Sequence, residues 1–187
     1  SFIYTMPGSF GSVKRCAIYR DPDAFKRNLN LYVVSTDKDA KLIKTNSQVK
    51  ENLKTWLAQS KMINDTIDIL DAKIVNVQIK YTILSYNMLN SLDIMIKATN
   101  ALKERYSRNF DIGENFDLDE ARKILLEIPG VDGVRNLRLV NKFGGAYSSI
   151  SYDVTSNIDS QNRFVQVPKN VILEIKYPDD DIIGTIK

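Results

Sequence analysis

Hydrophobic and polar residues alternate most regularly between Lys73 and Leu84. Because successive side chains of a β-strand point to opposite faces, this pattern predicts one long strand with two different faces. We expect an antiparallel strand whose polar face is in water, with cover by a partner subunit as the alternative for that face. The hydrophobic face would carry Val75, Val77, Ile79, Tyr81 and Ile83, and the polar face Asn76, Gln78, Lys80 and Thr82.

Shorter stretches rich in β-branched and aromatic residues predict further strands. In the stretch 66–70, Ile67 and Ile69 would share one face. The other predicted strands cover residues 13–20, 28–35, 134–140, 146–154, 161–167 and 171–177.

Two segments have hydrophobic residues at helical spacing. The first follows Ser47, a residue suited to an N-cap, and includes Trp56, which we interpret as a core anchor. The second runs from Asn87 to Arg108 and is long enough to cover a sheet face. Its expected apolar stripe consists of Met88, Leu92, Met95, Ile96, Thr99, Leu102 and Tyr106.

A third helix has both of its ends marked in the sequence. Asp117 is expected to cap it, with Glu120 three residues later in a capping-box arrangement. Pro129 and Gly130 should stop it, because proline cannot continue a helix and glycine accepts left-handed geometry. Further turns are expected at Gly113 before the helix and at Gly133 after it. These six residues are predicted to be structural turns and caps.

The order of these elements predicts an α+β fold, with antiparallel or mixed sheets packed with two or three helices. The glycines after Phe143 break the pattern. We therefore expect an α+β region over residues 1–142 and a β-rich C-terminal lobe over 143–187. Because the sequence begins at Ser1 with structured-looking residues, we expect it to be part of a longer protein.

The composition narrows the possible chemistry. The 187 residues include 26 basic and 23 acidic ones, a net charge of +3 with both signs interspersed, which suits protein partners better than a polyanion. Cys16 is the only cysteine and histidine is absent, which excludes an intramolecular disulfide and every histidine-dependent catalytic motif. We expect no enzyme activity, no catalytic or cofactor-binding residues and no membrane span.

Aspartates recur in three places, and each group could in principle bind a divalent cation through its carboxylate oxygens. None of the three matches a metal-loop pattern, so we predict no metal site. The places are Asp21 with Asp23, then Asp65 with Asp68 and Asp71, and finally Asp179 to Asp181. The glycine-containing stretches 8–12 and 130–133 precede predicted strands, which is the wrong context for a phosphate-binding loop.

Several landmarks along residues 13–140 together resemble the baseplate J-like family, the wedge proteins of contractile-tailed bacteriophages and related injection machines. The clearest is the segment Ile128-Pro129-Gly130-Val131, with Gly133 and Val134, that joins a helix to a strand. The others are residues 28–34, the helix around 53–57, the strand pair 67–83, and Phe110 with Ile112, Gly113 and Glu114. Within this family, the chain is most similar to the C-terminal part of the long form of the wedge protein, the form found in tailed phages with large baseplates.

The resemblance implies a structural role without catalytic residues. Such a protein would be made late in infection, assembled in the host cytoplasm and carried in the virion. It would form homodimers or a ring. It would also contact other baseplate wedge proteins around the hub that supports the contractile sheath. The residues alone leave two other hypotheses open. One is a nucleic-acid-binding α+β module, favoured by the slight basic excess; the other is an enzyme that uses carboxylates or lysine.

Overall fold

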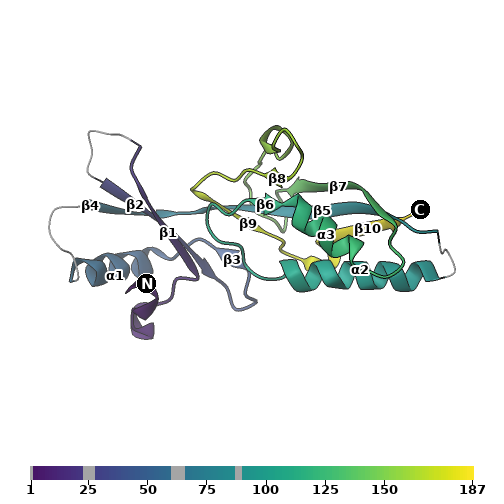
Figure 1. Ribbon diagram of the computed structural model, residues 1–187. Coiled ribbons are helices and arrows are strands. Elements are labelled where there is room, and N and C mark those ends of the chain that lie inside the picture. The colour runs from purple at the N-terminus through teal and green to yellow at the C-terminus, as the bar shows by residue number, and fades with distance from the viewer. Residues whose placement is uncertain (1, 23–27, 60–65, 87–89) are drawn as a thin grey trace. The chain divides into compact units, whose positions relative to one another are not determined.

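The computed structural model describes residues 2–22, 28–59, 66–86 and 90–187. The predicted α+β class is confirmed, since helices combine with antiparallel and mixed sheets (Figure 1). The chain divides into two compact units. Unit 1 comprises residues 1–74, 111–113 and 169–172, and unit 2 comprises 75–110, 114–168 and 173–187.

Unit 1 contains a mixed sheet built around strand β2 (Asn28–Thr36). β2 pairs antiparallel with β1 (Arg15–Arg20) and β3 (Leu42–Ile43), and parallel with β4 (Thr66–Asp71). Helix α1 (Ser47–Ala58) contributes Leu53 to a core that it shares with Leu31 and Val33. Two short 3-10 helices, Phe2–Thr5 and Gly8–Phe10, precede β1.

The first residue of α1 differs from the prediction. Ser47 is already helical, and the N-cap is Asn46, whose side-chain oxygen accepts a hydrogen bond from the Gln48 backbone N–H at 2.7 Å. Trp56 is half-buried, and the helix buries Leu53 instead.

Unit 2 is organised around strand β5 (Lys73–Leu84), whose first two residues belong to unit 1. β5 pairs antiparallel with β7 (Gly133–Lys142) and parallel with β10 (Ile182–Ile186), and it also pairs with β9 (Val171–Glu174). A second, two-stranded sheet joins β6 (Phe116–Asp117) to β8 (Phe164–Val165).

Helix α2 (Ser91–Tyr106) runs along the strands of unit 2 (Figure 1), and Thr99 shares a 2.8 Å hydrogen bond with the hydroxyl of Tyr81. Helix α3 (Leu118–Leu126) follows β6 directly. Between these elements the Tyr106 ring lies 4.9 Å from that of Phe116 and 6.2 Å from that of Phe110. This aromatic cluster anchors the core beside the sheet. The other helices in the described part of the chain are a 3-10 turn, Thr155–Asn157, and α4, Pro178–Asp181.

The apolar stripe predicted for α2 is confirmed at Leu102 and Tyr106, which are buried, and wrong at Leu92 and Ile96. Leu92 and Ile96 are 73% and 51% exposed. The buried residues of this helix are Ile94, Ala98, Leu102 and Tyr106. The sequence contains hydrophobic residues on both sides of the helix, so spacing alone did not select the face in contact with the sheet. Met88, the first residue of the predicted stripe, lies outside the described residues.

The C-terminal region also differs from its prediction. Residues 146–154 form bends and turns, and β8 occupies only two residues of the predicted strand 161–167. The boundary expected after residue 142 does not coincide with the division into units. Residues 182–186 complete the sheet of β5 instead of forming part of a separate lobe.

Candidate functional site

The predicted cap and turn residues have specific structural contacts. The Asp117 side chain caps α3 by accepting a hydrogen bond from the Glu120 N–H at 2.9 Å. The Glu120 carboxylate does not complete a capping box. It accepts two bonds of 2.8 Å from Arg105, and thus ties α3 to α2.

The three glycines predicted at turns differ from one another in conformation and contacts. Gly130, directly after Pro129, has φ +93°, and a side chain there would meet Ile94 of α2. Gly113, in unit 1, has φ +77°, and its N–H donates to the Val171 carbonyl at 2.7 Å. Gly133 opens β7 opposite Leu84 and has no positive φ. Asp117, Gly113 and Gly130 thus act on the backbone at a cap or a turn, whereas the Glu120 side chain joins two helices.

The polar face of β5 is the main correction to the sequence analysis. Asn76, Gln78 and Thr82 are all buried, with Asn76 only 1% exposed. The face that was predicted to be in water is covered over part of its length by later segments of the same chain. The two ends of this face differ in how they are covered.

At the covered end, a hydrogen-bond network holds irregular segments against the sheet. The Asn76 amide donates to the Glu174 carboxylate at 2.8 Å, while its oxygen accepts from the Ser148 N–H at 2.7 Å. Gln78 donates to the carbonyl of Asp180 at 3.3 Å. Because buried polar groups are costly without partners, these bonds fix the position of the segments that contain Ser148 and Asp180.

Asp181 belongs to the same network. The stretch 179–181, one of the three aspartate groups considered for a cation, forms α4, and the Asp181 side chain is fully buried. Its carboxylate accepts hydrogen bonds from the Tyr147 hydroxyl at 2.8 Å and from the Tyr177 N–H at 3.0 Å. Burial, followed by the hydrogen bond to Asp181 and its negative charge, raises the pKa of Tyr147 to about 12. We interpret this cluster as structural, since each carboxylate oxygen has a donor.

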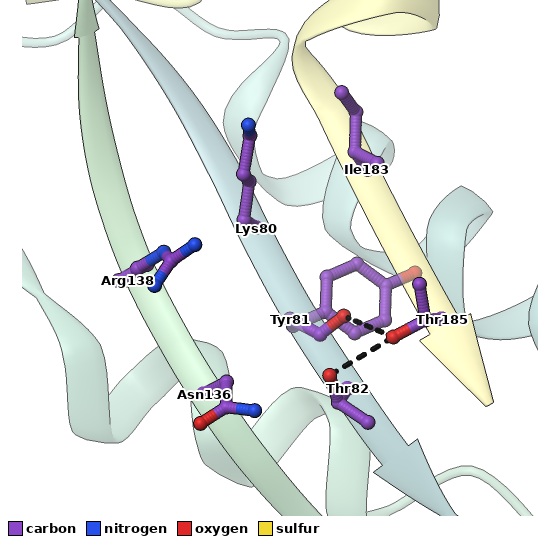
Figure 2. Close-up of a pocket in the computed structure, with 7 residues that line it drawn as sticks. All are labelled: Lys80, Tyr81, Thr82, Asn136, Arg138, Ile183 and Thr185. Carbon is purple, nitrogen blue, oxygen red and sulfur yellow. Dashed lines mark hydrogen bonds between the residues drawn. The ribbon is translucent and has the colours of Figure 1, made fainter. Parts of the chain in front are cut away.

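At the other end the polar face is open and forms a shallow depression of about 290 Å³ (Figure 2). Strands β5, β7 and β10 each contribute to its lining, and we call the depression the cationic shelf. Besides Tyr81, it is lined by Lys80, Thr82, Asn136, Arg138, Ile183 and Thr185.

A β-bulge in β7 shapes the shelf. The register places Arg138 opposite Lys80 but Arg135 opposite Thr82, so Asn136 and the following residue both oppose Tyr81. Asn136 has φ +51°, a left-handed conformation that a non-glycine residue rarely adopts. The bulge thereby brings Asn136 to the rim beside Arg138 (Figure 2).

The charge of the shelf is not balanced within the described part of the chain. Neither Lys80 nor Arg138 forms an ion pair with any described residue. Like charges directly opposite each other on neighbouring strands are destabilising. An anion held between the two side chains would relieve this repulsion, which makes the shelf the best candidate for a ligand contact. The sequence analysis placed Lys80 on the polar face, but no signal linked it to Arg138 or Thr185.

The described members of the aspartate clusters considered for cations do not form a metal site. Within the described ranges, no three aspartate, glutamate or cysteine side chains converge in a way that could hold a metal ion. Asp68 is exposed, whereas Asp23 and Asp65 lie outside those ranges. No helix among the described residues is both long and apolar enough to cross a bilayer.

No protein-family model and no curated protein matches the sequence.

Proposed function

We propose that the chain is a structural assembly protein of a bacteriophage tail baseplate wedge. It self-associates and contacts other wedge proteins, and together they form the ring around the hub that supports the contractile sheath. The similarity of its landmarks to the baseplate J-like family supports this role. The virion would be its final location.

The structural observation that carries the proposal is the exposed apolar surface of α2. Leu92 and Ile96 are one helical turn apart and largely exposed. Met95 and Ile96 also border a depression of about 210 Å³ on the same helix. Removal of such a surface from water is favourable by roughly 25 cal/mol per Å² and is typical of contacts between proteins. We therefore assign Leu92 and Ile96 to a contact between subunits.

Sedimentation velocity over a range of concentrations tests this assignment. The parent chain is expected to form dimers or larger species as its concentration rises. The double substitution Leu92→Lys and Ile96→Lys should weaken association about tenfold or more, while leaving the helix intact, because both residues are exposed and lysine is a good helix former.

Glu104→Lys is the matched control. It lies on the exposed side of the same helix and changes the net charge by the same +2, but it removes no apolar side chain. It should associate like the parent. A parent chain that stays monomeric at every concentration, or a double variant that associates normally, contradicts the proposed role.

The second candidate is a nucleic-acid-binding α+β module, for which Lys80 and Arg138 of the cationic shelf would provide positive charge. It requires an affinity for DNA or RNA that falls steeply as salt is added, because bound phosphates release counterions. A titration at low salt that detects no association with a single-stranded or double-stranded oligonucleotide rejects this candidate.

A further inference from the structure

We propose that the cationic shelf binds the carboxylates of an acidic segment of a partner protein. The inference deepens the proposed assembly role and rests on it, because it assigns a second contact surface and the chemistry of what covers it. The partner segment would contain glutamate or aspartate side chains that reach Lys80 and Arg138.

The geometry of the two cations is the first argument. Lys80 on β5 and Arg138 on β7 are paired directly across the sheet, an arrangement in which Cβ atoms are about 5 Å apart. Both side chains lie over the same face of the sheet (Figure 2). The planar guanidinium of arginine presents a fork of donors that matches a carboxylate, and the lysine ammonium adds a second charge beside it.

The polar groups around the cations favour the same ligand. Thr82 and Thr185 hydrogen-bond to each other at 2.9 Å, and Thr185 also lies 3.4 Å from the Tyr81 carbonyl, which fixes the floor of the shelf. Asn136 is exposed at the rim, where its side-chain amide provides N–H donors. No carboxylate lines the depression, so its described residues provide donors and positive charge for an incoming anion.

The shape of the shelf favours an anion that is attached to a protein. Pockets for free small molecules enclose most of the ligand surface, whereas this depression is open over the face of the sheet. A free anion would keep most of its hydration and bind weakly. A carboxylate on a docked segment is held by the other contacts as well, and the 41%-exposed Ile183 offers an apolar surface to its methylene groups.

The lining residues also argue against a nucleic-acid strand. Surfaces that bind single strands combine positive charge with exposed aromatic rings on which bases stack. Tyr81 is the one aromatic residue among those lining the shelf, and its ring is buried with its hydroxyl bonded to Thr99 of α2. It is therefore not available for stacking.

Titration of the ¹⁵N-labelled chain with a synthetic hexaglutamate peptide, followed by NMR, tests the proposal. The backbone amide signals of Lys80, Arg138 and Thr185 are expected to shift, and the shifts should weaken as salt is added. The double substitution Lys80→Gln and Arg138→Gln should lower the affinity about tenfold or more. Its spectrum away from the shelf should match that of the parent, because both side chains lie at the surface of the sheet.

Lys97→Gln with Lys123→Gln is the matched control, since it removes two exposed lysines elsewhere and leaves the same net charge as the shelf variant. This control should bind the peptide like the parent. Shifts that miss the shelf, or an affinity that the shelf substitutions leave unchanged, overturn the proposal. It is also overturned if inorganic phosphate alone, or a single-stranded DNA oligonucleotide, binds the shelf more tightly than the peptide.

The two proposals can fail separately. A chain that binds the peptide at the shelf but stays monomeric contradicts the assembly role and leaves the carboxylate chemistry of the shelf intact. A chain that self-associates through Leu92 and Ile96 but does not bind the peptide contradicts only the proposal that the shelf binds carboxylates.

Discussion

Gly130 is a residue with two separate reasons to lack a side chain. Its φ of +93° is a conformation that L-residues rarely adopt, and a Cβ atom built there would lie 2.7 Å from Cδ1 of Ile94. The close approach brings the turn after α3 directly against the buried side of α2. The sequence predicted the turn, but the approach to Ile94 depends on tertiary packing.

Gly130→Ala should therefore lower the free energy of unfolding by about 2–4 kcal/mol, from the backbone strain and the clash with Ile94 together. Gly144→Ala provides the comparison, since Gly144 also has a positive φ, +77°, but a Cβ atom added there would meet nothing within 4 Å. It should cost only the strain of about 1–2 kcal/mol. Urea denaturation of both variants measures the difference. Equal losses in the free energy of unfolding would show that the Ile94 side chain can move aside without destabilising the protein.

At the scale of the element, the two adjacent polar residues at the start of α1, Asn46 and Ser47, should contribute differently to stability. Asn46→Ala removes the side-chain oxygen that accepts from Gln48 and should cost about 1 kcal/mol. Ser47→Ala places a better helix former inside the first turn and should change stability by only a few tenths of a kcal/mol. Thermal unfolding followed by circular dichroism checks the order. A larger loss from the Ser47 variant would place the cap where the sequence analysis expected it.

Strand β5 shows what an alternating sequence pattern can predict and what it cannot. Its alternation correctly predicted the strand from Lys73 to Leu84, including both ends. It did not predict that Asn76 is buried, because the partner of that amide is Glu174, 98 residues further along the chain. A local pattern reports which residues share a face, but not which distant segment covers it.

The candidate site was hidden for the same reason. Lys80 stood out only as one polar residue of an alternating strand. The register of β7 places Arg138 opposite Lys80, and the bulge beside this pair contains Asn136 in a left-handed conformation, which no turn signal in the sequence marked. In α2 the helix was predicted, but Leu92 and Ile96 formed as good a stripe as the residues that are buried.

At the scale of the whole molecule, Tyr147 links stability to alkaline pH. Its pKa is raised from 10.0 to about 12 by burial and by Asp181, so the folded state holds this proton more tightly than the unfolded state. The contribution is complete below pH 10 and is lost as pH rises towards 12. The free energy of unfolding should therefore decline across this window. Part of the decline has another source, because burial also raises the pKa of Tyr106.

Tyr147→Phe separates the two contributions. Near neutral pH it should cost about 1–3 kcal/mol, because the buried Asp181 carboxylate loses a hydrogen-bond donor. Above pH 10 the gap between variant and parent should narrow. Urea unfolding at intervals from pH 7 to 12 measures both quantities, and parallel curves would show that Tyr147 does not titrate differently in the two states.

The pairing of β5 with β10 has a consequence for how the protein is made. The hydroxyls of Thr82 and Thr185 that meet in this pair are separated by 103 residues. A ribosome therefore releases β5 long before its parallel neighbour β10 exists, and this long strand must wait for its partner. Such late, long-range pairing is slow and leaves hydrophobic edges open to other nascent chains. The order of synthesis thus creates a period in which unwanted association competes with completion of the sheet.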